Sequence, residues 1–181
     1  MSTGLDSRTE SVLADTEAQP FLAGGGMRSI GFRAEKEQVA FAVVDCDGNG
    51  NCELHADGKL SVAGDETSKA LALFRNEVMN VISKYKPVAI GMRTSDNPKQ
   101  TRFFQAMLSR ARVEGVILEA AGFRSIKVHY GASSTIKAGM GTKKRLSTYT
   151  SADSIRGIDL SGKKNVIVRE AVLAALAALG S

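Results

Sequence analysis

The chain has 181 residues, of which 43% are hydrophobic and 24% are charged, a balance typical of a folded globular domain. No run of 18 or more apolar residues occurs, which excludes a membrane-spanning helix, and two cysteines are too few for a disulfide-built scaffold. The net charge of +5 is uneven: residues 1–83 hold 7 basic and 13 acidic side chains, whereas residues 84–164 hold 16 and 5. This asymmetry favours a surface that meets a polyanion, although solvated surfaces show the same pattern.

The first 27 residues are rich in Ser, Thr, Asp and Glu and show no apolar periodicity. We expect a disordered leader over residues 1–27 and a single domain over residues 28–181. The leader lacks the apolar core of a secretion signal, and its four acidic residues against one arginine oppose a mitochondrial transit peptide. Together with the low cysteine count, this favours a reducing, cytoplasmic location.

Short β-type runs open the predicted domain, and helical and extended patterns then alternate. The first runs, at residues 29–33, 38–44 and 52–55 together with 59–62, predict an antiparallel three-stranded meander. The remaining predicted elements are a helix from Asp65 to Lys86, a strand at 88–92, a helix at 98–121, a strand at 125–130, a short helix at 133–139, an irregular loop at 142–164 and a buried helix at 166–179. Strands joined by helical crossovers run parallel. The order therefore predicts an α/β fold with a mixed five-stranded sheet, three antiparallel strands and then two parallel strands, flanked by helices.

Three stretches carry a family resemblance that spans about residues 28–180. The apolar strand Val88–Gly91 follows three strands and a helix, the segment Ala132–Lys144 has a Ser-rich helix start followed by a Gly-rich basic loop, and Arg169–Leu176 places an acid before an Ala-Leu-rich run. In the order of the elements and in these short motifs, the chain resembles proteins of the ribonuclease H-like fold, and among them the Holliday-junction resolvases of the RuvC and YqgF types. A small bacterial resolvase-like family of unknown function is similar too.

The resemblance implies three carboxylates, from the first strand, the fourth strand and the last helix, that hold two divalent ions for phosphodiester cleavage. This chain departs from that pattern. Arg33 stands where the family sequence Ile-Gly-Ile-Asp has its aspartate, and Arg93 stands in the stretch of the fourth strand where a glutamate is expected. Only Glu170 remains as a candidate catalytic acid. Because two arginines repel a metal ion, we expect no catalytic activity and no cofactor, in other words a nuclease fold without nuclease chemistry.

The segment Asp45–Gly50 resembles the opening of a calcium-binding loop, but Ala56 occupies the position of its bidentate acid. We therefore interpret it as a polar hairpin turn, with Asp45 and Asp47 as secondary metal candidates. A metal site made of Cys46, Cys52 and His55 is less favoured still, because no second pair of ligands is present. His129, on the predicted fifth strand, is interpreted as a structural residue.

The basic second half supplies the candidate binding residues. We expect the partner to be nucleic acid, with DNA favoured over RNA, or a nucleoprotein complex, and we expect no membrane partner. The predicted binding residues are Arg33, Arg93, Lys99, Arg102, Lys137, Lys143, Lys144 and Arg145. One alternative is an active Mg²⁺-dependent nuclease in which Glu170, Asp45, Asp47 or Asp96 form a non-standard site. The other is a protein-interaction subunit without nucleic acid, for which a homodimer through the long helix is one arrangement.

Overall fold

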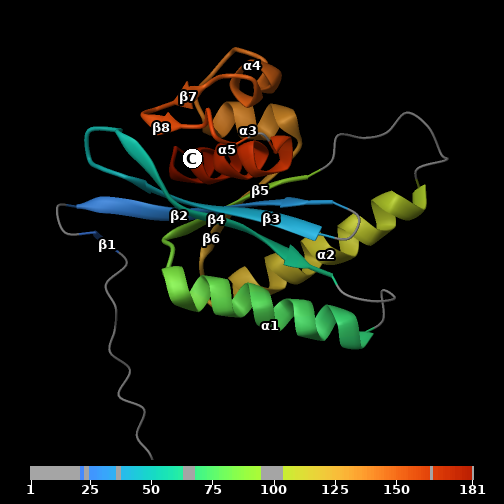
Figure 1. Ribbon diagram of the computed structural model, residues 1–181. Coiled ribbons are helices and arrows are strands. Elements are labelled where there is room, and N and C mark those ends of the chain that lie inside the picture. Colours follow the sequence, from blue (N-terminus) through green and yellow to red (C-terminus); the bar gives the residue numbers. More distant parts are fainter. Residues whose placement is uncertain are drawn as a thin grey trace, which may run out of the picture.

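A central sheet lies between two layers of helices in the computed structural model of the chain (Figure 1). The structure describes residues 21–22, 25–35, 38–62, 68–94, 104–163 and 165–180. The strands of the sheet are β1 (Phe21–Leu22), β2 (Gly26–Ala34), β3 (Gln38–Cys46), β4 (Cys52–Ser61), β5 (Ala89–Arg93) and β6 (Lys127–Gly131). The helices are α1 (Ser68–Tyr85), α2 (Phe104–Phe123), α3 (Ser133–Gly139), α4 (Leu146–Thr150) and α5 (Val166–Leu179). None of the described helices combines the length and the apolar character that crossing a membrane requires.

The main sheet has the order β4-β3-β2-β5-β6, and β1 pairs with β2 off this path. The mixture of three antiparallel and two parallel strands is the one that the sequence pattern predicts. The strands β2, β3 and β4 form an antiparallel meander, while β5 pairs parallel with β2 and β6 pairs parallel with β5. The parallel register places Gly31 opposite Gly91 and Arg33 opposite Arg93. Two arginines therefore end neighbouring strands at the same edge of the sheet.

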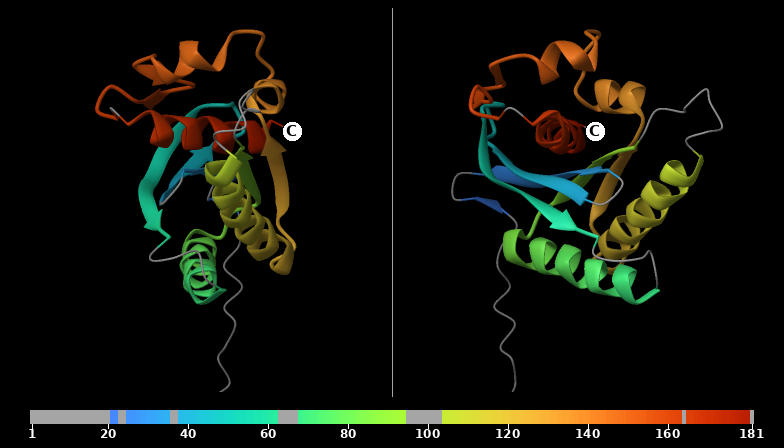
Figure 2. Two further views of the ribbon diagram at one scale, coloured as in Figure 1. Left: turned by 90° about the vertical axis from the view of Figure 1, so that its right-hand side faces the viewer. Right: turned by 45° about the vertical axis from the view of Figure 1, so that its right-hand side comes forward.

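The two faces of the sheet are covered by different helices (Figure 2). Helix α1 buries one stripe of residues four positions apart, Ala70, Phe74, Val78 and Ile82, and packs with α2 on one face of the sheet. Helix α5 lies on the other face, beneath α3 and α4, and is apolar almost all round because both the sheet and these segments cover it. The predicted buried character of this last helix is confirmed.

Helix α5 approaches the sheet very closely, because two glycines leave room for its backbone. A Cβ atom built on Gly31 would collide with the backbone of Ala171 and Ala175, and one built on Gly91 would collide with that of Ala174. Small residues on both surfaces therefore set the separation between helix and sheet. This close contact brings Glu170 of α5 to the strand ends that carry the two arginines.

Strand pairing includes Phe21 and Leu22, which pair with Met27 and Gly26. One expectation about the elements was wrong. The segment 142–164, predicted as an irregular loop, contains α4 and the hairpin of β7 (Ser154–Ile155) and β8 (Ile158–Asp159).

A buried arginine, Arg169, holds residues 142–163 in place. The guanidinium of Arg169 on α5 donates to the carbonyl oxygens of Thr150, Ala152, Leu160 and Lys163. Four apolar side chains of the segment are also buried against α5 or the sheet, namely Leu146, Ile155, Ile158 and Leu160. Scattered apolar residues among Ser, Gly and Lys give no periodic signal, so a helical or extended pattern could not be detected there.

Candidate nucleic-acid interface

Three charged side chains from different elements meet at the ends of β2 and β5. Arg33 Nε donates to Glu170 Oε2 at 2.6 Å, and Arg93 Nη1 lies 3.4 Å from the same oxygen. The Arg33 and Glu170 side chains are 13% and 17% exposed, so the pair is largely withdrawn from solvent. Two guanidinium groups from neighbouring strands therefore share one carboxylate of α5.

Further hydrogen bonds fix the orientation of the two arginines. Arg33 Nη1 donates to the carbonyl oxygen of Arg93 at 3.2 Å, which ties the ends of the two strands together. Arg93 donates to Ser133 Oγ at 2.9 Å and to the carbonyl oxygen of Thr94 at 3.3 Å. Because Ser133 begins α3, this bond also links the sheet to the segment that follows β6. The guanidinium of Arg93 is thereby held on the floor of an open pocket.

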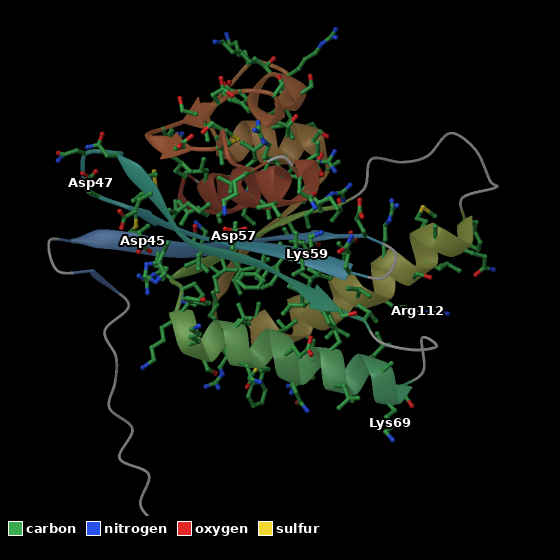
Figure 3. All side chains as sticks on the ribbon, viewed as in Figure 1. Asp45, Asp47, Asp57, Lys59, Lys69 and Arg112 are labelled. Carbon is green, nitrogen blue, oxygen red and sulfur yellow. A yellow bond between two sulfur atoms is a disulfide. The ribbon has the colours of Figure 1, made fainter. Side chains whose placement is uncertain are left out.

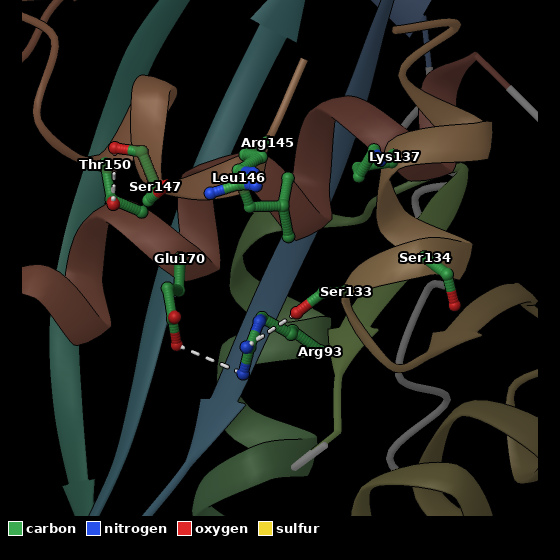
Figure 4. Close-up of a pocket in the computed structure, with 9 residues that line it drawn as sticks. All are labelled: Arg93, Ser133, Ser134, Lys137, Arg145, Leu146, Ser147, Thr150 and Glu170. Atoms are coloured by element: carbon green, nitrogen blue, oxygen red, sulfur yellow. Dashed lines mark hydrogen bonds and ion pairs between the residues drawn. The ribbon is translucent and has the colours of Figure 1, made fainter. Parts of the chain in front are cut away.

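The pocket has a volume of about 440 Å³ and lies between β5, α3, α4 and α5 (Figure 4). Its charged lining consists of Arg93, Lys137, Arg145 and Glu170, three cations and one carboxylate. Ser134, Ser147 and Thr150 also line it. The hydroxyls of Ser147 and Thr150 were missed from the sequence because they belong to the segment expected to be irregular.

The predicted binding residues fall into three groups. Arg33, Arg93, Lys137 and Arg145 gather at or beside the pocket. Lys143 and Lys144 are exposed on the turn that leads into α4, where the Lys144 backbone N–H donates to Thr142 Oγ1 at 3.2 Å. Lys99 and Arg102 lie outside the described residues, as does Asp96, which belongs to the nuclease alternative.

The secondary metal candidates Asp45 and Asp47 are occupied by protein hydrogen bonds, at the β3–β4 end of the molecule (Figure 3). Arg28 binds both carboxylate oxygens of Asp45, at 2.6 and 2.7 Å, and the bond to Asp45 raises the pKa of the arginine. Asp47 accepts from the side chain of Asn51 and from the backbone N–H groups of Asn49 and Asn51. These bonds, that of the Asn51 side chain first, lower the pKa of Asp47 and make it a turn residue.

Cys46 and Cys52 stand opposite each other in the β3–β4 ladder and form a disulfide. The bond removes both thiols as metal ligands and leaves His55, whose Nδ1 lies 3.4 Å from Asp45 Oδ2, without partners for a metal site. Disulfides are uncommon in the reducing environment that the sequence favoured. Within the described part of the chain, no group of three or more His, Cys, Asp or Glu side chains could hold a metal ion.

Glu114 on α2 is a charged residue of this region that the sequence did not single out. Its Oε1 atom is buried and has no hydrogen-bond partner among the described residues. Burial raises the pKa of its carboxyl above the ordinary value of 4.5, and the positive charges of Arg33 and Arg110 oppose that rise. Because the charge of Arg33 affects this pKa, Glu114 lies within electrostatic range of the cluster of Arg33, Arg93 and Glu170.

We expect Glu114 to make the protein less stable as the pH rises. Between pH 4.5 and the raised pKa, the folded carboxyl keeps a proton that the unfolded one has released, so the free energy of unfolding falls with increasing pH. Glu114→Gln should remove this component and flatten the fall of the melting temperature above pH 4.5. The exposed Glu77, changed to Gln, controls for the loss of one negative charge. An unchanged pH profile in Glu114→Gln would contradict the assignment.

No known protein family model and no curated protein matches the chain. Solved structures do match. Thermus thermophilus RuvC in complex with a Holliday junction superposes with a TM-score of 0.66 at 15% identity, over 83% of this chain and 92% of RuvC. The mitochondrial Holliday junction resolvase of yeast superposes with a TM-score of 0.59 at 10% identity, over 87% of this chain and 79% of that protein. This chain has the RuvC-like fold. The predicted ribonuclease H-like α/β class is thereby confirmed, and the RuvC-like core spans nearly the full length of its bacterial counterpart.

Proposed function

We propose that this RuvC-like domain binds nucleic acid, DNA in preference to RNA, through a basic surface and does not cleave it. One observation carries the proposal: Arg33 and Arg93 converge on Glu170 where the resemblance implies a set of metal-binding carboxylates. The fold supports a nucleic-acid partner, since the RuvC structure is described as a complex with a Holliday junction. The domain acts as a binding or scaffolding unit of a nucleoprotein complex.

Charge explains why such a site favours phosphate over metal. Two unit charges about 4 Å apart interact by roughly 4 kcal/mol at an effective dielectric constant of 20. A divalent cation beside Arg33 and Arg93 would meet repulsion of about twice that size from each guanidinium, with Glu170 as the carboxylate to attract it. A phosphate oxygen in the same place meets attraction, because guanidinium groups bind phosphate in a charge-assisted geometry.

The other cations line the pocket or lie beside it. Lys137 and Arg145 line its walls, and Lys143 and Lys144 are exposed beside Arg145 on the same turn. Cations of this kind neutralise backbone phosphates and release counterions, and they carry no sequence information. We therefore expect binding that depends strongly on salt and weakly on sequence.

The test is to measure binding of a four-way junction, duplex, single-stranded DNA and RNA at about 50 and about 200 mM salt. DNA affinity should fall more than about tenfold between the two concentrations. Changing Lys143, Lys144 and Arg145 together to Ala should weaken binding of unrelated sequences equally. The same change should reduce the log-log salt slope by roughly 2–3, about 0.9 for each duplex phosphate that the protein no longer neutralises.

A matched control removes three cations from the opposite face of the sheet. Lys69, Lys84 and Arg124 are exposed on α1 and beyond the end of α2, and their replacement by Ala leaves the slope close to that of the parent (Figure 3 labels Lys69). Equal effects of the two triple variants would contradict the assigned surface. No binding by the parent at low salt would favour the protein-interaction alternative.

The same substrates, incubated with Mg²⁺ or Mn²⁺, should remain uncut, because one carboxylate cannot hold a metal pair. Metal-dependent cleavage that disappears in Glu170→Ala would establish the nuclease alternative instead.

A further inference from the structure

Among the residues that the structure describes, the lining of the pocket beside Arg93 holds more cations than carboxylates. Of its charged lining, Glu170 is the single carboxylate, and its Oε2 atom already accepts from Arg33, which stands outside the lining. Lys137 and Arg145 form no ion pair with any residue that the structure describes. Lys137 and Arg145 therefore face the open volume without a counter-charge among the residues that the structure describes.

We propose that this pocket binds the terminal phosphate of a nucleic-acid strand directly, with no metal ion between phosphate and protein. The proposal rests on the function proposed above and adds to it the chemical group that is recognised. In this arrangement Arg93 contacts the phosphate from the floor of the pocket, and Lys137 and Arg145 contact it from α3 and from the start of α4 (Figure 4). Hydroxyls of Ser134 and Ser147 supply further hydrogen-bond donors at the same pocket.

Charge matching favours a strand end over an internal phosphate. A phosphomonoester carries about −1.5 to −2 charges at neutral pH, whereas an internal phosphodiester carries one. Lys137 and Arg145 form no ion pair among the described residues and so give the lining an excess of two positive charges, which matches the dianion. The phosphodiester backbone of an intact duplex would leave half of that excess without a counter-charge.

Shape points to the same ligand. A pocket of about 440 Å³ lies within the range of small-molecule sites, which enclose a ligand on several sides. A strand end can insert its phosphate and the attached sugar into such a pocket. Arg93 is already fixed by Ser133 and Glu170, so little side-chain freedom is lost when the phosphate contacts it.

The experiment compares short single-stranded oligonucleotides that carry a 5′-phosphate, a 3′-phosphate or neither, by fluorescence anisotropy in EDTA. A terminal phosphate should raise the affinity of the parent protein about tenfold, with or without the chelator. The affinity ratio between phosphorylated and unphosphorylated strands should fall to about one in Lys137→Ala and in Arg145→Ala. Comparing the 5′ and 3′ arms shows which end is recognised.

Lys144→Ala is the matched control, since Lys144 precedes Arg145 on the same turn but does not line the pocket. It should weaken both strands by the same factor and keep the tenfold ratio. Thermal melts of the three variants should coincide with that of the parent, because Lys144 and Arg145 are exposed and Lys137 is only half-buried. A parent ratio near one, or a ratio that appears only with Mg²⁺, would overturn the proposal.

If the parent binds no oligonucleotide at all, the function proposed above is wrong. Binding of pyrophosphate then tests whether the pocket still binds phosphate. Titration in EDTA should shift the backbone amide resonances of α3 and α4 in the parent and not in Lys137→Ala. Such shifts would uphold direct phosphate binding for a small ligand and refute the nucleic-acid strand as its source. Their absence would overturn the pocket as well.

Discussion

Replacing Gly91 by alanine will lower the free energy of unfolding by about 3 kcal/mol, the upper end of the usual range for an overpacked core. The added Cβ would collide with the backbone of Ala174, which cannot rotate away as a flexible side chain could. Helix α5 must therefore move off the sheet, and the apolar surface between them becomes less well packed. For a domain of this size, the loss corresponds to a melting temperature roughly 6–12 °C lower.

Gly115→Ala is the matched control for this substitution. Beyond the neighbouring backbone of its own helix, nothing lies within 4 Å of a Cβ built on Gly115, which is exposed in the middle of α2. Alanine should therefore raise stability there by about 0.5–1 kcal/mol. Gly31→Ala should resemble Gly91→Ala, because both glycines face α5. The double variant should lose less than the sum of the two, since one displacement of α5 relieves both collisions. A Gly91→Ala melt equal to that of the parent would contradict the close packing.

Arg169→Met will destabilise the protein by about 3–5 kcal/mol, as expected when one partner of a buried, charged hydrogen-bond network is removed. The Arg169 side chain is nearly buried and donates to four backbone carbonyls between residues 150 and 163, and methionine can bond none of them. The loss should be concentrated in the segment that Arg169 holds. Hydrogen exchange should therefore accelerate at residues 146–160 far more than in the central strands.

Arg169→Lys separates the charge from the geometry. Lysine keeps the positive charge but lacks the planar fork that reaches carbonyls on several sides, so most of the loss should remain. Arg75→Met provides the surface comparison: Arg75 forms an ion pair with Glu119 in solvent, and its removal should leave the melting temperature almost unchanged. Slow, parent-like exchange at residues 146–160 in Arg169→Met would show that burial of Leu146, Ile155, Ile158 and Leu160 alone orders the segment.

The sheet and its main helices could be predicted because their signals are local and periodic. The β-branched run in β3 and the four-residue stripe of α1 each indicate their own structure, and the helical crossovers then require parallel strands. The convergence of Arg33, Arg93 and Glu170 followed from the family resemblance, which aligned positions far apart in the sequence. Binding by the basic residues stays a prediction.

The remaining features depend on interactions that no local pattern encodes. Helix α4 and the β7–β8 hairpin are held because Arg169, on a later helix, donates hydrogen bonds to the carbonyl oxygens of their segment. The pairing of Cys46 with Cys52 depends on the register of β3 and β4. The position of Glu114 near Arg33 depends on how α2 lies against the sheet, which sequence spacing along α2 does not reveal.

Glu170 competes with any bound anion for the two guanidinium groups, and it is itself part of the protein chain. It holds Arg33 at 2.6 Å and stands near Arg93, so an incoming anion must share these groups with a carboxylate that never diffuses away. Without that carboxylate, two guanidinium groups at facing positions of adjacent strands would repel each other and weaken the edge of the sheet. The stability of the fold and the affinity for an anion therefore oppose each other at Glu170. Any change at Glu170 that tightens anion binding also removes the ionic bridge between α5 and the sheet.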